Sequence, residues 1–213
     1  MNYEIKNKRE IRRLTIRNNI LAIAEEEFLE NGFRLTNMDE IADKASVTKR
    51  TLYKYFPSKI ALFIQMFDIH LKNLEMILKK NIATDDKAVT VLKKNFRSLF
   101  EYTKKNARFM RLYWMIDSKE FEGEIPKELT QRVSTMTKQM LMISKPAVDK
   151  AIDEGSIFDE DSILLVHLMS AINKGIFIHT NKEKRFEIAD IDPEKLFDVV
   201  ISIFERGLFK TNE

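Results

Sequence analysis

The stretch SVTKRTLYKYFPSK, residues 46–59, combines positive charge with apolar anchors in one short segment. It carries four cations and no acid, alongside the apolar and aromatic residues Val47, Leu52, Tyr53, Tyr55 and Phe56. Thr48 predicts the start of a short helix, because its hydroxyl can cap a free backbone N–H. Pro57 and Ser58 predict the end of that helix and the cap of a long one that follows.

A second short helix is expected just before this stretch. The hydroxyl of Thr36 can cap its first turn, and the side chain of Asp39, three residues later, can accept from the backbone N–H of the cap in return. Its apolar residues are Met38, Ile41, Ala42 and Ala45. Two short helices around a tight turn, held by a hydrophobic triangle of Ile41, Val47 and Leu52, predict a helix-turn-helix.

The outward side of the second short helix is rich in groups that suit DNA. Such side chains can donate to phosphates, reach base edges and touch thymine methyl groups. The set comprises Thr48, Lys49, Arg50, Thr51, Tyr53 and Lys54. The alternative interpretation of the same charges is the solvated surface of a short helix.

The positive charge of the chain is concentrated near its N-terminal end. The 213 residues hold 36 Lys and Arg against 33 Asp and Glu. Residues 1–60 contain twelve of these cations and nine of the acids, so residues 61–213 contain twenty-four of each. The early cations form two groups, 6–17 and 44–59, separated by Glu25, Glu26, Glu27 and Glu30. Two such basic patches predict binding to a polyanion.

Composition favours helices throughout. Only five Gly and four Pro interrupt the chain, which suits an all-α fold better than many strands joined by tight turns. Apolar residues from Ile11 and Leu14 to Phe28 recur at helical spacing and predict a first helix over about 8–31, with a stop at Asn31-Gly32. The same periodicity also predicts a long helix over 58–80 and a seam from Leu129 to Ile143 that Pro146 breaks.

The last two helices are expected near 159–180 and 193–209. Both are apolar on more than one face, which a helix sustains when it is buried on two sides. A charged loop, NKEKRFEIADID, separates them. These helices predict an isologous four-helix interface between two copies, with Gly175 allowing close approach.

Catalysis and export are not indicated. The chain has no Cys, and its three His lack a ligand-like spacing, so neither a metal site nor a cofactor is expected. No apolar run approaches the ~20 residues of a membrane span, and the N-terminus does not look like a signal peptide. We therefore expect a cytoplasmic protein that is not an enzyme.

Residues 28–63, FLENGFRLTNMDEIADKASVTKRTLYKYFPSKIALF, resemble the N-terminal DNA-binding domain of TetR-type transcriptional regulators. A Gly-aromatic pair, a Thr-capped helix, an Ile-Ala core pair, a Thr-Leu-Tyr helix and a Phe-x-Ser-Lys exit occur in the family's order. The resemblance implies that Lys49, Arg50 and Tyr53 face bases. It also implies phosphate contacts from the arm ahead of the first helix and from Thr36, Thr51, Tyr55 and Lys59.

Three positions depart from the family pattern. Ser46 stands where Gly is preferred in the turn, so a positive φ there would cost about 1 kcal/mol. Arg50 stands where Gly is common, which puts a long donor beside the bases. Ile60 replaces the usual Glu at the start of the long helix, and no role is carried over to it.

For the rest of the chain, position, length and the resemblance imply a ligand-binding and dimerisation domain. Nine aromatic and Met side chains either line a mostly apolar ligand pocket or belong to the ordinary hydrophobic core. The residues are Phe96, Phe100, Phe109, Met110, Tyr113, Trp114, Met136, Met140 and Phe177.

The sequence thus predicts an all-α chain with a helix-turn-helix domain over 1–57 and a helical ligand-binding and dimerisation domain over 58–213. The predicted function is a homodimeric repressor that binds double-stranded operator DNA and is controlled by a mostly apolar small-molecule effector. The alternative is a helical lipid- or hydrophobe-binding protein whose basic N-terminus meets a membrane surface or a partner protein.

Overall fold

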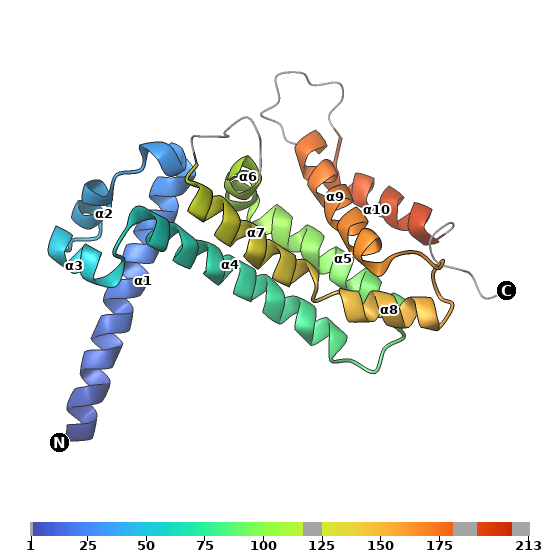
Figure 1. Ribbon diagram of the computed structural model, residues 1–213, viewed down its shortest axis with the longest axis horizontal. Helices are drawn as coiled ribbons and strands as arrows, with labels where there is room; N and C mark the ends of the chain where they lie inside the picture. Colours follow the sequence, from blue (N-terminus) through green and yellow to red (C-terminus); the bar gives the residue numbers. More distant parts are fainter. Residues whose placement is uncertain (1, 117–124, 181–190, 206–213) are drawn as a thin grey trace. The chain divides into compact units, whose positions relative to one another are not determined.

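A computed structural model describes residues 2–116, 125–180 and 191–205 of the chain (Figure 1). These residues form ten helices and no strand, which confirms the all-α prediction. The chain divides into two compact units. The N-terminal unit comprises Met1–His70 and Arg108–Met136, and the C-terminal unit comprises Leu71–Ala107 and Thr137–Glu213. The compact units therefore do not follow the functional boundary predicted at residue 57.

The N-terminal unit contains the predicted helix-turn-helix. Its complete helices are α1 (Asn2–Leu35), α2 (Met38–Lys44), α3 (Lys49–Tyr55) and, apart from one residue, α6 (Ala107–Ile116). It also holds the first half of α4 (Lys59–Ile82) and most of α7 (Lys127–Leu141).

Helix α1 is longer than its apolar pattern predicts. It runs from Asn2 to Leu35. At the predicted stop the helix is interrupted but does not end, because Gly32 has a non-helical backbone with φ 69°. Ile20, Ala24 and Phe28 are buried as expected. Ile11 and Leu14 share the helical spacing but are 56% and 47% exposed. Periodicity reports a face of the helix but not whether another element covers it.

The cap of α2 lies one residue later than predicted. Asn37 is the N-cap, and its side-chain oxygen accepts from the backbone N–H of Asp39 at 2.8 Å. Thr36 is buried, with its hydroxyl 3.1 Å and 2.7 Å from the carbonyl oxygens of Glu27 and Gly32. Thr and Asn are both good caps, so the sequence offered two adjacent candidates.

The turn between α2 and α3 confirms two expectations. Thr48 caps α3 by accepting from the backbone N–H of Thr51 at 3.1 Å. Ile41 and Leu52 are fully buried, and the half-buried Val47 lies between them in sequence. Ser46 has φ 55°, in the left-handed region that favours glycine.

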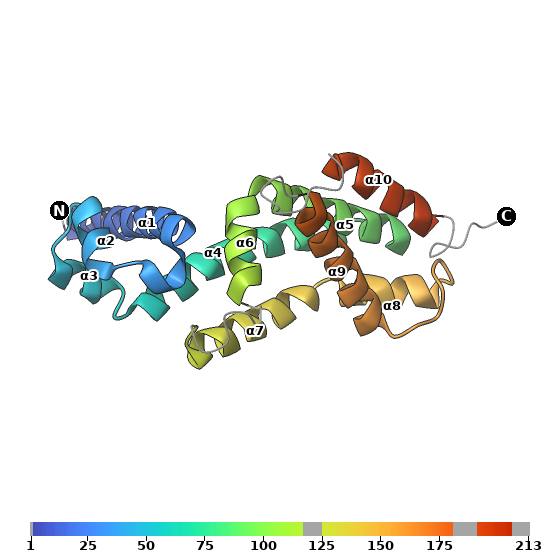
Figure 2. The ribbon, with the colours of Figure 1, turned by 90° about the horizontal axis from the view of Figure 1, so that it is seen from above.

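The C-terminal unit packs around α5 (Ala88–Lys105), α8 (Lys145–Asp153) and α9 (Ser162–Thr180). Each of these three helices contacts the other two, and α10 (Pro193–Ile203) contacts α9 (Figure 2). Helix α7 ends at Leu141, and α8 starts at Lys145 with Pro146 in its first turn. The predicted break at Pro146 is confirmed.

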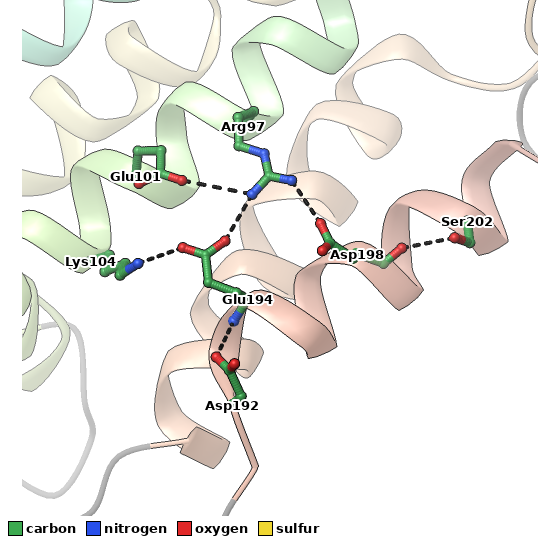
Figure 3. Close-up of polar contacts among 7 residues, drawn as sticks. All are labelled: Arg97, Glu101, Lys104, Asp192, Glu194, Asp198 and Ser202. Atoms are coloured by element: carbon green, nitrogen blue, oxygen red, sulfur yellow. Dashed lines mark hydrogen bonds and ion pairs between the residues drawn. The ribbon is translucent and has the colours of Figure 1, made fainter.

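Arg97 on α5 forms ion pairs with residues of α10 (Figure 3). Its guanidinium donates to Glu194 at 3.0 Å and to Asp198 at 2.7 Å, and lies 4.2 Å from the ring centroid of Phe197. Lys104 also pairs with Glu194, while Asp192 caps α10. Exposed ion pairs contribute little singly, but this network and its cation–π contact fix the orientation of α10.

Helices α9 and α10 carry the two-sided apolarity that the sequence indicates. Buried side chains such as Val166 and Phe197 face the core, while several apolar ones are exposed: Ile163, Leu164, Leu168, Ile178, Val199 and Ile203. By length and composition alone, α9 also passes as a membrane span, contrary to the expectation that no segment does. Most of the predicted charged loop and the end of 193–209 lie outside the described residues.

The strained turn yields a prediction about stability. Because a non-glycine residue in the left-handed region costs about 1–2 kcal/mol, Ser46→Gly should stabilise the protein by up to about 1 kcal/mol after the extra freedom of the unfolded chain is subtracted. Ser46→Ala keeps the Cβ and should give no such gain. Chemical denaturation of both variants checks this; equal stability of the two would show that the turn is not strained.

Candidate nucleic-acid interface

The structure brings most of the predicted DNA-binding side chains onto one exposed face of α3. Thr48, Lys49, Arg50 and Lys54 are exposed, and Tyr53 is 46% exposed. Thr51 and Tyr55 are half-buried. Leu52 on the opposite side anchors the helix in the core. The helix therefore presents its polar side chains as a single surface.

The cations on this face differ in what they contact. The Lys49 ammonium donates to Asp39 at 2.6 Å, and this hydrogen bond raises the pKa of Lys49. Both side chains are exposed, so the pair is weak and salt-sensitive. Arg50 and Lys54 form no ion pair within the described part of the chain. Asp39 is a member of this surface that sequence reasoning treated only as a capping residue.

Two residues predicted to meet phosphates form hydrogen bonds within the unit. Thr36 is buried, and its hydroxyl donates to backbone carbonyls. Lys59 donates to the carbonyl oxygens of Arg34 and Thr36, each at 3.0 Å, and lies 4.9 Å from the Phe33 ring centroid. Partial burial lowers the pKa of Lys59. It closes the junction between α1 and α2.

A further group of cations lies on the first half of α1. Lys8, Arg9, Arg12 and Arg13 are all exposed, at spacings that place them on one side of the helix. They lie on α1, within the range 8–31 predicted for the first helix.

The predicted ligand-binding residues are divided between the two units. Phe109, Met110, Tyr113, Trp114 and Met136 belong to the N-terminal unit. There, Phe109 stacks on His70 with ring centroids 3.7 Å apart and lies 5.2 Å from Phe67. Phe109 is therefore a core residue of that unit.

The C-terminal unit holds the remaining four: Phe96, Phe100, Met140 and Phe177. Phe96 and Met140 line a small cavity of about 30 Å³ together with Leu78, Asn95, Leu99, Leu141, Ser144, Val166, Met169 and Ser170. This is room for about one water molecule, whereas ligand pockets measure about 300–1,000 Å³. Any effector taken up here requires the cavity to open.

Comparison with known proteins assigns the helix-turn-helix to a family. Residues 20–66 match the family described as bacterial regulatory proteins, tetR family. The HTH-type transcriptional activator FasR of Mycolicibacterium smegmatis is 30% identical over 47% of this chain and 46% of that protein. The chain thus spans about half the length of FasR.

Two other proteins are similar over most of the chain. IcaR of Staphylococcus aureus, a negative transcriptional regulator of a biofilm operon, is 24% identical over 86% of this chain and 94% of that protein. The structure of the regulator FadR of Bacillus subtilis in complex with stearoyl-CoA covers 89% of this chain and 98% of its own, with a TM-score of 0.72 and 18% identity.

The fold and the α3 surface define a helix-turn-helix protein with a helical C-terminal unit. The matched residues include α2, α3 and the start of α4, and so contain the whole predicted site. Residues 20–66 are thus similar to the tetR family of bacterial regulatory proteins.

The position of Lys59 leads to a test of its structural role. Lys59→Met removes the donor for two backbone carbonyls, worth about 1 kcal/mol, and should lower Tm by about 2–4 °C. Lys54→Met removes an equally charged but exposed side chain of α3 and should leave Tm unchanged. Thermal unfolding compares the two; equal Tm values would place Lys59 among the solvated cations.

Proposed function

We propose that this chain is a homodimeric transcriptional regulator that binds double-stranded operator DNA through α3 and answers to a mostly apolar small-molecule effector. The observation that carries the proposal is the exposed face of α3, where Arg50 and Lys54 stand unpaired among the described residues beside Tyr53. The protein works in the cytoplasm and needs no catalytic step for this role.

The geometry of α3 suits the major groove. A helix fits that groove, where each base pair presents a distinct pattern of donors and acceptors. Arg50 can pair bidentately with guanine, and the hydroxyl of Tyr53 can reach a phosphate or a base edge. Thr48 and Thr51 lie with their hydroxyl oxygens 2.9 Å apart, and Thr48 also caps the helix. Their main contribution is to hold the helix start in place.

The exposed apolar stripe on α9 supports a dimer. Its members follow one another at alternating steps of four and three residues, the spacing of a helix that packs along a partner helix. They are Leu164, Leu168, Ala171, Gly175 and Ile178. A Cβ at Gly175 would meet nothing within 4 Å among the described residues, which leaves room for a second copy. Val199 and Ile203 extend the surface onto α10.

Repression is the proposed direction of control. IcaR, which is aligned over nearly its whole length, is a negative regulator, whereas the activator FasR is aligned over less than half. FadR provides a case of the same fold with a long acyl ligand. An effector with an apolar body agrees with the apolar lining of the cavity in the C-terminal unit.

A lipid- or hydrophobe-binding protein remains the second candidate, and the composition of α9 is the observation that favours it. Sequence-selective DNA binding with a steep dependence on salt separates the two functions. We favour the regulator for two reasons. Dimerisation would cover the exposed apolar stripe on α9, and DNA binding accounts for the exposed basic and polar side chains of α3.

Arg50 and Asp39 make a matched pair for testing the DNA interface. On duplexes selected from a random library, Arg50→Ala should lose about 1–3 kcal/mol of affinity and lose preference at one base pair. Asp39→Asn removes a negative charge and releases Lys49, so it should tighten binding to every sequence and increase the salt slope by about one. Fluorescence anisotropy measures both. Selection of no preferred duplex, or unchanged binding by Arg50→Ala, would refute the assignment.

Two adjacent residues separate dimerisation from folding. Phe204 lies in the predicted last helix, 193–209, which the sequence pattern places at the interface. Its side chain is buried, and its ring centroid lies 5.6 Å from that of Phe96, so it belongs to the core. Ile203 is 61% exposed. Ile203→Glu should therefore dissociate the dimer with the helical content retained, whereas Phe204→Glu should unfold the C-terminal unit. Light scattering and circular dichroism report the two effects. A parent chain that is monomeric at micromolar concentration would rule out the dimer.

A further inference from the structure

The interior of the C-terminal unit contains an amide whose hydrogen bonding is incomplete. Asn173 on α9 is 2% exposed. Its Nδ2 donates to the hydroxyl of Thr103 on α5 at 2.9 Å, and that hydroxyl donates to the carbonyl oxygen of Leu99 at 2.8 Å. Its Oδ1 is the buried side-chain oxygen or nitrogen for which the described residues provide no partner.

The deficit does not depend on which way the amide is turned. If the oxygen and nitrogen of Asn173 exchange places, Thr103 can donate to the oxygen, but Nδ2 then faces the unpartnered side. Either orientation leaves one polar atom of the amide unsatisfied. A buried polar atom without a partner destabilises the free protein, so its presence calls for an explanation.

Other buried polar groups of this unit are satisfied. Asn95 donates to Ser144 at 3.2 Å and accepts from Asn81 at 3.0 Å, and Asn81 also donates to Ser98 at 3.0 Å. Asn95 and Ser144 line the small cavity. At this end of the cavity, both the oxygen and the nitrogen of the Asn95 side chain therefore have a hydrogen-bond partner.

The incomplete amide lies one helical turn beyond the cavity on both helices that form this seam. Leu99 and Ser170 line the cavity, while Thr103 follows Leu99 by four residues and Asn173 follows Ser170 by three. Met140 and Met169 also line it, and unbranched Met side chains readily change rotamer. Rearrangement of these two side chains would extend the cavity along α5 and α9 toward Asn173.

We propose that Asn173 recognises the effector, and that the effector is an elongated apolar molecule with one hydroxyl or amide group. The apolar body occupies the seam between α5 and α9, and the polar group completes the hydrogen bonding of the Asn173 amide. A hydroxyl both donates and accepts, so it satisfies the amide in either orientation. This inference rests on the proposed ligand-controlled regulator and adds the chemistry of the ligand.

The test compares n-alkanols from hexanol to dodecanol with 1-chloroalkanes of equal chain length. Ligand-dependent shifts of Tm give the affinity of the full-length protein for each probe. The parent should bind the best alkanol about tenfold more tightly than its chloro analogue, because only the alkanol completes the amide. Asn173→Leu should bind both probes alike.

The ligand-free stability of the variants provides a second readout. Asn173→Leu removes the unsatisfied atom and leaves the bond from Thr103 to Leu99 in place, so it should raise the Tm of the free protein. An Asn173 with a purely structural role would instead give a lower Tm or an unfolded variant, and either result overturns the proposal. Thr103→Val, which loses the hydroxyl but keeps Asn173, should retain the preference for the alkanol.

Failure of this inference is distinguishable from failure of the proposed function. If no alkanol binds, or if Asn173→Leu keeps the preference, Asn173 is not the recognition residue. The selection of operator DNA and the Arg50→Ala titration do not involve the C-terminal unit's interior. Sequence-selective DNA binding together with a negative alkanol result would thus reject the effector chemistry alone.

Discussion

The packing of Phe63 against two aromatic rings of α1 stabilises the helix-turn-helix unit. Phe63 on α4 meets Phe28 and Phe33 edge-on, with centroids 4.9 Å and 5.4 Å apart. Phe67, one turn later, lies 5.2 Å from Phe109 on α6. Aromatic pairs in these geometries add to the burial energy of large rings. The position of α3 follows from this cluster, because α3 leads directly into α4 and its Leu52 and Phe56 are buried in the same unit.

Helix α4 is the element through which a ligand could influence DNA binding. Lys59 in its first turn bonds to the backbone ahead of α2, and Leu78 in its last turns lines the cavity of the C-terminal unit. One continuous helix thus begins at the junction that Lys59 closes and ends at the cavity of the C-terminal unit. A ligand that prefers one position of the C-terminal end of α4 would shift the population of positions at the other end. The effect on DNA affinity cannot exceed the difference in ligand affinity between the two states.

Sequence reasoning predicted the structure correctly where a residue type strongly favours one local backbone feature, such as a helix break, a cap or a turn. Pro146, Gly32 and Thr48 appear at the breaks and caps expected of them, and Ser46 adopts the positive φ that its place in the turn required. It did not decide outcomes that depend on neighbours from other elements. Ile11 and Leu14 have a core-like spacing but no cover among the described residues, while Lys59 is charged like an interface residue yet bonds to backbone carbonyls. The buried Asn173 carries no signal in the sequence, since its burial and missing partner arise from tertiary packing alone.

The two faces of α9 connect these observations. Its outer face carries the stripe from Leu164 to Ile178 proposed to meet a second copy, and its inner face carries Asn173. Interiors are close-packed, so a ligand that opens the seam between α5 and α9 must displace one of these helices. The Arg97 network ties α10 to α5, which limits how far α5 can move without breaking several contacts at once. The other possibility is a displacement of α9. The same movement would alter the proposed dimer surface, and with it the spacing of two α3 helices that must match major grooves about 34 Å apart.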